Sequence, residues 1–157
     1  MNKKLKVLYH GSPNKLIGDT LNLSEGTDSD ERLENNLFGV YASDRKDFAI
    51  VIAIFNCKGV LGGSIEGFAK NKIDARIYGN FPKQKYVYIY VLPLKTFKRT
   101  KSIEHQFISD KPVKPIKIEK ILISDYLYLI QRATEEQTQK WIKKYNKNIK
   151  INTYISM

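Results

Sequence analysis

The sequence has little of several residue types, and each shortage excludes a class of protein. Its 157 residues include a single cysteine, Cys57, so no disulfide can form within the chain. No run of 18 or more apolar residues is present, and the N-terminus lacks the apolar segment of a secretory leader. We therefore expect a soluble, cytoplasmic protein that does not associate with membranes.

Histidine is almost as scarce, which bears on metal binding. His10, Cys57 and His105 are the only His and Cys side chains, and their spacing matches no zinc-ligand pattern. The acidic residues between 25 and 34 lack the spacing and central glycine of an EF-hand loop. The glycines between 59 and 67 form neither a GxGxxG motif nor a P-loop. The sequence therefore predicts no bound metal and carries no nucleotide-binding fingerprint.

What the chain has in excess is positive charge, and this excess is confined to one half. Residues 1–80 contain 11 Lys or Arg and 10 Asp or Glu, a balance of +1, whereas residues 81–157 contain 16 and 6, a balance of +10. A basic half favours partners that carry phosphate, such as a dinucleotide or nucleic acid, or an acidic protein. The alternative is a lysine-rich surface that only contacts solvent.

The length fits one domain, 1–157, and the hydrophobic pattern predicts an α+β fold. Residues 11–36 and 68–82 are predicted as connections. Because strands and helices do not alternate regularly, we expect packed sheets with helices outside rather than a doubly wound parallel sheet. Period-two or short apolar runs predict strands at 6–9, 39–42, 86–92, 97–99, 103–108 and 116–123, and longer patterns predict helices at 44–55, 125–131 and 135–145.

Two short motifs place polar side chains at the ends of predicted strands. Leu8-Tyr9-His10-Gly11-Ser12 follows the first strand, and the turn residues after His10 predict that it lies on a rim. Phe38-Gly39-Val40-Tyr41-Ala42-Ser43 forms a second strand and is followed at once by a helix, for which Ser43-Asp44 is the predicted N-cap. Catalytic and binding residues are common at such strand ends.

Together, YHGS at 9–12, FGVYAS at 38–43, the strand at 86–92 and QFISDKPVKPIKIEKI at 106–121 resemble the ADP-ribosyltransferase superfamily. The resemblance is to its His-Tyr-Glu branch, which includes diphtheria-toxin-like and poly(ADP-ribose) polymerase-like enzymes and small bacterial and phage members. It implies a split β-sandwich in which two small sheets form a crevice for NAD, the substrate. The core would span about 6–124, with a helical segment at about 125–145.

The resemblance also implies roles for individual residues. His10 would bind the adenosine ribose, Gly11 the nicotinamide amide through its backbone, and Tyr41 would stack on the nicotinamide ring. Ser12 and Ser43 would lie in the same NAD-binding site. Because breaking the glycosidic bond of NAD builds positive charge on the ribose, the family uses a third-motif glutamate as the source of negative charge.

The third motif departs from the family pattern. Gln106 stands where the glutamate is expected, and a neutral amide cannot offset the developing charge. Glu104 lies two residues earlier, and period two would place it on the same strand face as Gln106, with His105 on the opposite face. The catalytic candidates are therefore Tyr41, Gln106 and Glu104, unless the true third motif lies elsewhere in the chain.

Two classes of function follow, with a third that is less favoured. The chain could transfer ADP-ribose from NAD to a macromolecule, such as nucleic acid or a nucleic-acid-binding protein, or hydrolyse NAD. Alternatively, it is a weakened relative that binds a nucleotide or a partner without catalysis, as Gln106 suggests. RNA 2'-phosphotransferases have a related fold but require additional basic residues, and Arg45, Arg76 and Arg99 belong to no recognisable motif.

Overall fold

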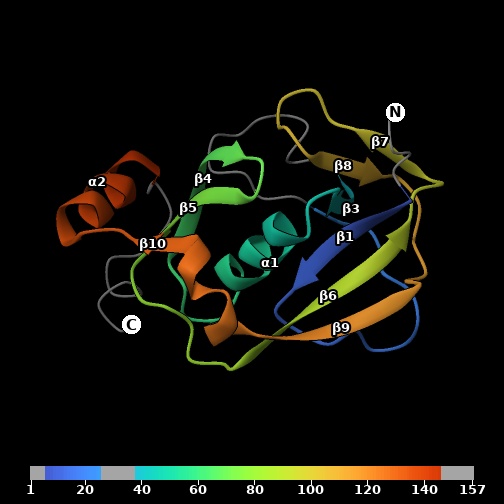
Figure 1. Ribbon diagram of the computed structural model, residues 1–157, viewed down its shortest axis with the longest axis horizontal. Helices are drawn as coiled ribbons and strands as arrows, with labels where there is room; N and C mark the ends of the chain where they lie inside the picture. The colour runs from blue at the N-terminus through green and yellow to red at the C-terminus, as the bar shows by residue number, and fades with distance from the viewer. Residues whose placement is uncertain (1–5, 26–37, 146–157) are drawn as a thin grey trace.

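The computed structural model describes residues 6–25 and 38–145, and its architecture is α+β, with two sheets and two α-helices (Figure 1). The larger sheet contains seven strands in the order β7-β8-β3-β1-β6-β9, with β2 paired to β3. All of its pairings are antiparallel. Its strands are β1 (Val7–Ser12), β2 (Ser24–Glu25), β3 (Phe38–Ser43), β6 (Tyr86–Pro93), β7 (Phe97–Arg99), β8 (Gln106–Ser109) and β9 (Lys117–Leu122).

The smaller sheet has three strands in the order β10-β5-β4. Its strands are β4 (Gly62–Ala69), β5 (Lys72–Tyr78) and β10 (Ile130–Arg132). The pairing of β10 with β5 is parallel, and that of β4 with β5 is antiparallel. Helix α2 (Glu135–Tyr145) packs on this sheet through Trp141, whose ring stacks on Tyr78 with the centroids 4.9 Å apart.

Helix α1 (Lys46–Phe55) lies between the two sheets and packs against β1, β6 and β5 (Figure 1). The N-cap of this helix is Arg45 and not the predicted Ser43-Asp44, and no side chain caps the first turn. The Ser43 hydroxyl instead accepts a hydrogen bond from the Arg45 backbone N–H at 2.9 Å, which fixes the turn just before the helix. Apolar residues occupy nearly every side of this helix, so it is stable only where protein covers it all round. The expected arrangement with all helices outside the sheets is therefore wrong for α1.

The two faces of the larger sheet belong to two separate parts of the core. One face, which includes Val87, Ile89 and Ile121, packs against α1 and the smaller sheet. The opposite face, which includes Leu8, Tyr90 and Leu92, is covered by the loop after β1 and by residues near 113. Because successive residues of a strand alternate between faces, this division also assigns each site residue to a face.

Several predicted elements are confirmed, and others are corrected. The strands at 86–92, 97–99 and 116–123 and the helices at 44–55 and 135–145 correspond to β6, β7, β9, α1 and α2. Residues 68–82, predicted as a connection, contain β5, whose alternating buried side chains (Ile73, Ala75, Ile77) complete the core. The first strand continues through Gly11 and Ser12, so His10 lies inside β1 and not on a rim.

The segment 125–131 is also not the predicted helix. It forms two 3₁₀ turns, Ile123–Asp125 and Leu127–Leu129, and then enters β10. Leu129 and Ile130 are buried in the α1 cluster, so this segment contributes to the hydrophobic core. A three-residue strand at the edge of a small sheet leaves no periodic signal of its own, which is why the pattern was ambiguous.

Helix α1 packs tightly against β1 at Gly11. A Cβ atom at this position would lie 2.0 Å from the Ala49 backbone oxygen, whereas a Cβ at Gly67 would meet no atom within 4 Å. Gly11→Ala must therefore displace the helix, and we expect it to lower the free energy of unfolding by about 1–3 kcal/mol in urea denaturation.

Gly67→Ala is the matched control and should leave stability unchanged or raise it slightly, because alanine loses less backbone entropy in a strand. Equal stability of both alanine variants would contradict the packing of α1 on β1.

Candidate functional site

The first site residue, His10, is held by the second motif. Its Nδ1 donates a hydrogen bond of 2.6 Å to the backbone carbonyl of Tyr41. His10 belongs to β1 and Tyr41 to β3, which are neighbours in the larger sheet. The structure therefore brings together two residues that are 31 positions apart in the sequence.

This hydrogen bond lies where β1 and β3 stop pairing. The register between these strands consists of the pair Tyr9 with Ser43, whereas β1 pairs with β6 from Val7 to Ser12. The next pair in the β1–β3 register would be Gly11 with Tyr41, and at this point the Tyr41 carbonyl accepts a hydrogen bond from the His10 ring. The His10 side chain thus links β1 to β3 beyond their backbone pair.

The protonation of His10 follows from its surroundings. Burial lowers the pKa of His10 below its ordinary value of 6.5, partly offset by the hydrogen bond to the Tyr41 carbonyl. Because Nδ1 is the donor in that bond, the neutral ring carries its lone pair on Nε2. His10 is therefore an acceptor at Nε2 at neutral pH, suited to a hydroxyl group of a ligand.

Gln106 shares the larger sheet with His10 and Tyr41. Register pairs connect Tyr9 with Ser43 and Ser43 with Gln106, so β1, β3 and β8 lie side by side. With neighbouring strands about 4.8 Å apart, β1 and β8 are separated by about 10 Å. All three motifs thus contribute to one region of one sheet.

The motifs do not all lie on the same face, however. His10 neighbours the Tyr90 ring, with 6.1 Å between ring centroids, on the face away from α1. Gln106 pairs with Ser43, and Tyr41 lies two residues from Ser43 on β3, so both side chains lie on the face that α1 covers. A ligand that touches all three would have to pass the place where β1 and β3 separate.

Gln106 is anchored by a neighbouring hydroxyl. The Thr100 Oγ1 donates a hydrogen bond of 3.1 Å to the Gln106 Oε1, and the Thr100 backbone N–H bonds the Gln106 carbonyl at 2.9 Å. Thr100 is buried, and its hydroxyl also lies 3.3 Å from the carbonyl oxygens of Ile103 and Gln106, so its one proton is shared among three acceptors. A glutamate at position 106 could accept the same hydrogen bond, because its shape is nearly that of glutamine.

Glu104 does not replace the missing carboxylate from the same strand face, which corrects the expectation. Strand β8 begins only at Gln106, and Glu104 lies in the preceding turn with its side chain 75% exposed. His105 has a φ of 63°, in the left-handed region that breaks the alternation of a strand. Period two therefore does not relate Glu104 to Gln106.

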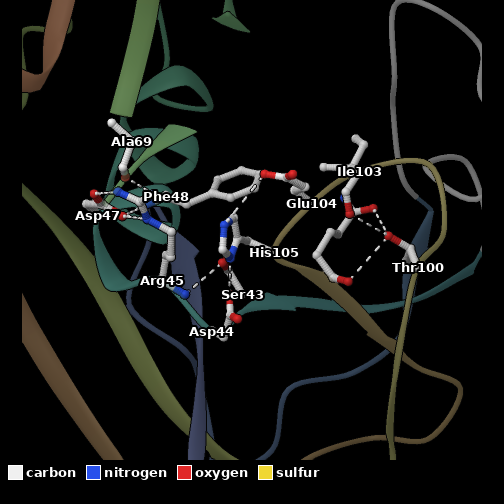
Figure 2. A network of polar contacts seen from close by, with 11 residues as sticks. Ser43, Asp44, Arg45, Asp47, Phe48, Ala69, Thr100, Ile103, Glu104 and His105 are labelled. Carbon is white, nitrogen blue, oxygen red and sulfur yellow. Dashed lines mark hydrogen bonds and ion pairs between the residues drawn. The ribbon is translucent and has the colours of Figure 1, made fainter. Parts of the chain in front are cut away.

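His105 is the centre of a polar network that the sequence did not predict (Figure 2). Its Nδ1 lies 2.9 Å from Asp44 Oδ1, and its Nε2 lies 3.8 Å from Glu104 Oε2. Its ring also meets the Phe68 ring edge-on at 4.9 Å. The network ties the start of β8 to the β3–α1 junction and to β4 of the smaller sheet. The residues next to His105 in the sequence form no pattern that predicts contacts with segments so far away along the chain.

The remaining predicted site residues have local structural partners. The Ser12 Oγ accepts a hydrogen bond from the Asn14 N–H at 3.2 Å, and Ser43 receives the N–H of Arg45 as described above. Gly11 lies directly against the Ala49 carbonyl of α1. These contacts fix the backbone on either side of the His10–Tyr41 bond.

The Tyr90 side chain also contributes to the site, a role that the sequence did not predict. Its hydroxyl donates to the Asn14 carbonyl at 3.1 Å and accepts from the Leu16 N–H at 2.6 Å. Tyr90 is fully buried beneath the loop that follows β1. It therefore fixes this loop over the face of the sheet on which His10 lies.

Other reactive groups are engaged elsewhere. Cys57 is buried, and desolvation raises its pKa to about 11, which makes it a poor nucleophile at neutral pH. Arg45 pairs with Asp47 at 2.6 Å, and Arg99 lies 5.0 Å from the Phe107 ring.

Among residues 6–25 and 38–145, no three His, Cys, Asp or Glu side chains are grouped as metal ligands. No helix in the same residues is long and apolar enough to cross a membrane.

The chain was compared with family models, with curated proteins and with solved structures, and no match was found in any of the three.

The lowered pKa of His10 predicts how stability depends on pH. Between pH 6.5 and the lower pKa of the folded state, the unfolded chain binds a proton that folded His10 does not. Stability is therefore complete above pH 6.5 and falls as the pH decreases. We expect urea denaturation to show this fall between pH 6.5 and about 5, above the range in which carboxylates protonate.

His10→Gln removes the titrating group and should flatten the pH dependence in this window. An unchanged pH profile in the His10 variant would contradict the buried, neutral state of His10.

Proposed function

We propose that this chain binds NAD at the His10–Tyr41 junction and transfers ADP-ribose from it to a macromolecule or to water, as ADP-ribosyltransferases do. The observation that carries the proposal is the neutral His10, fixed through Nδ1 by the Tyr41 carbonyl with Nε2 as acceptor. A ribose hydroxyl is a donor of the kind that Nε2 requires. The imidazole also joins β1 to β3 at the point where their register ends, so the two motifs meet at His10.

Tyr41 and Gln106 would act at the other end of NAD. The ring of Tyr41 supplies a surface for the nicotinamide, whose departure builds positive charge on the attached ribose. Gln106 lies on β8 next to β3 and can hydrogen-bond a ribose hydroxyl through its amide. It supplies no negative charge, so the transition state would be stabilised less than by a carboxylate.

The same residue favours a second candidate function, binding of NAD without turnover. Gln106 is anchored by Thr100, and Glu104 lies in an exposed turn outside β8. Neither observation supports a negative charge beside the ribose. On this account the chain binds NAD through His10 and Tyr41 but releases nicotinamide very slowly.

Nicotinamide release from labelled NAD tests the proposal, with NAD binding measured separately by calorimetry. We expect slow release by the natural chain and about a hundred-fold faster release by Gln106→Glu, the range attributed to one well-placed electrostatic group. Thr100 can donate to the new carboxylate, so its position should be preserved. Tyr41→Ala should weaken NAD binding, whereas Tyr41→Phe should retain it.

Glu104→Gln is the control and should leave release unchanged. Binding without release by the natural chain, together with a gain in Gln106→Glu, would establish the second candidate. No NAD binding by any variant would overturn the proposed function altogether.

A further inference from the structure

His105 and Asp44 form a histidine–carboxylate pair that lies outside the contacts proposed for NAD. The Asp44 Oδ1 lies 2.9 Å from the His105 Nδ1. An ionised carboxylate only accepts hydrogen bonds, so Nδ1 carries the proton of this bond. In the neutral ring the lone pair is then on Nε2. This is the arrangement in which a carboxylate orients a histidine that acts as a general base.

The second ring nitrogen of His105 is accessible to a further partner (Figure 2). The Glu104 carboxylate lies 3.8 Å from Nε2, beyond hydrogen-bond distance, and the Glu104 side chain is 75% exposed. Within residues 6–25 and 38–145, no hydrogen bond to Nε2 is formed. The His105 side chain itself is 29% exposed. A hydroxyl group from solvent or from an acceptor can therefore reach the lone pair.

The His105 ring lies on the same face of the larger sheet as Tyr41 and Gln106. It meets the Phe68 ring at 4.9 Å, and Phe68 meets Phe48 of α1 at 5.2 Å, so the imidazole is on the side that α1 covers. In a regular strand His105 and Gln106 would lie on opposite faces, but the φ of 63° at His105 breaks the alternation. The imidazole therefore belongs to the face on which the reacting ribose is proposed to lie.

The pair is built onto the end of the β3–β8 ladder. The last register pair of these strands is Ser43 with Gln106, so Asp44 and His105 are the next two residues along. Their side-chain bond extends the contact between the strands by one step. Because consecutive Cα atoms are about 3.8 Å apart, the backbone positions of the imidazole and of the Gln106 amide are close together. Left-handed conformations of residues other than glycine are concentrated at active sites.

We propose that His105 is the general base for the group that attacks the ribose, and that this group is a hydroxyl, from water or from a macromolecular acceptor. The inference rests on the proposed function. The hydroxyl oxygen forms a bond to the anomeric carbon of the ribose and gives its proton to Nε2 of His105. The bond between that carbon and the nicotinamide nitrogen breaks, and its electron pair leaves with the neutral nicotinamide. A hydroxyl needs a base because it is a weak nucleophile while it is protonated, whereas a carboxylate acceptor is already ionised.

Azide separates base catalysis from a structural role of His105. Azide is an anion at neutral pH and attacks without losing a proton, whereas water and methanol have to lose one. Labelled NAD is incubated with the protein in water, with methanol or with azide, and the ADP-ribose products are separated by mass spectrometry. His105→Asn removes the base, and asparagine tolerates the left-handed φ better than most residues. The comparison is made in the natural chain, because a glutamate at position 106 could take the proton itself.

We expect His105→Asn to slow the formation of ADP-ribose and of methyl ADP-ribose about a hundred-fold, the order of general base catalysis. Formation of the azide product and NAD binding measured by calorimetry should be unchanged. Equal loss of all three products would overturn the proposal, because it would indicate a structural role. Unchanged formation of both hydroxyl products would overturn it as well. The ratio of the two hydroxyl products in the natural chain tells whether water or an acceptor hydroxyl is preferred.

The failure of this inference is distinguishable from failure of the proposed function. Nicotinamide release that His105→Asn leaves unchanged would overturn the general base and keep the NAD site. No release by the natural chain, together with release by Gln106→Glu, would likewise overturn the general base alone. NAD binding with no release by any variant would overturn the transferase function, and this inference with it.

Discussion

The hydrogen bond from His10 Nδ1 to the Tyr41 carbonyl is the constraint on which the site depends. It joins β1 to β3 beyond their backbone pair at Tyr9 and Ser43, and it determines the tautomer of the ring. An imidazole in this position also has to be neutral, since burial disfavours its charged form. One contact therefore fixes the path of two strands and the chemistry of His10.

The packing of α1 between the sheets supports this constraint. Gly11 allows the Ala49 carbonyl to approach β1 directly, so the strand that carries His10 is pressed against the helix that follows β3. On the far side of β1, Tyr90 holds the loop after Ser12 through two hydrogen bonds. The strand that carries His10 is thus held from both faces of the sheet.

The sequence predicts those parts of the fold whose local pattern agrees with their environment. The alternation in 86–92 and the apolar helix at 44–55 are of this kind, and both are confirmed. Strand β5 was missed because its charged residues alternate with small and branched ones in a segment that reads as mixed. The extent of β1 was misjudged because Gly11 and Ser12 signal a turn, although here the glycine is required by the close approach of α1.

For the site, the two motifs around His10 and Tyr41 identified residues that are in contact, because each motif ends in the same region of the sheet. The environment of the third motif could not be predicted. A positive φ at His105 breaks the strand between Glu104 and Gln106, and this conformation is stabilised by Asp44, which is distant in the sequence. Long-range contacts of single side chains leave no periodic trace.

The most direct test of this account is the protonation state of His10 in solution. In a protein labelled with ¹⁵N-histidine, a long-range proton–nitrogen correlation spectrum distinguishes the two tautomers of each ring, and the His10→Gln variant assigns the signals. The account predicts that at pH 7 His10 is neutral with its proton on Nδ1. A proton on Nε2, or a doubly protonated ring, would contradict it.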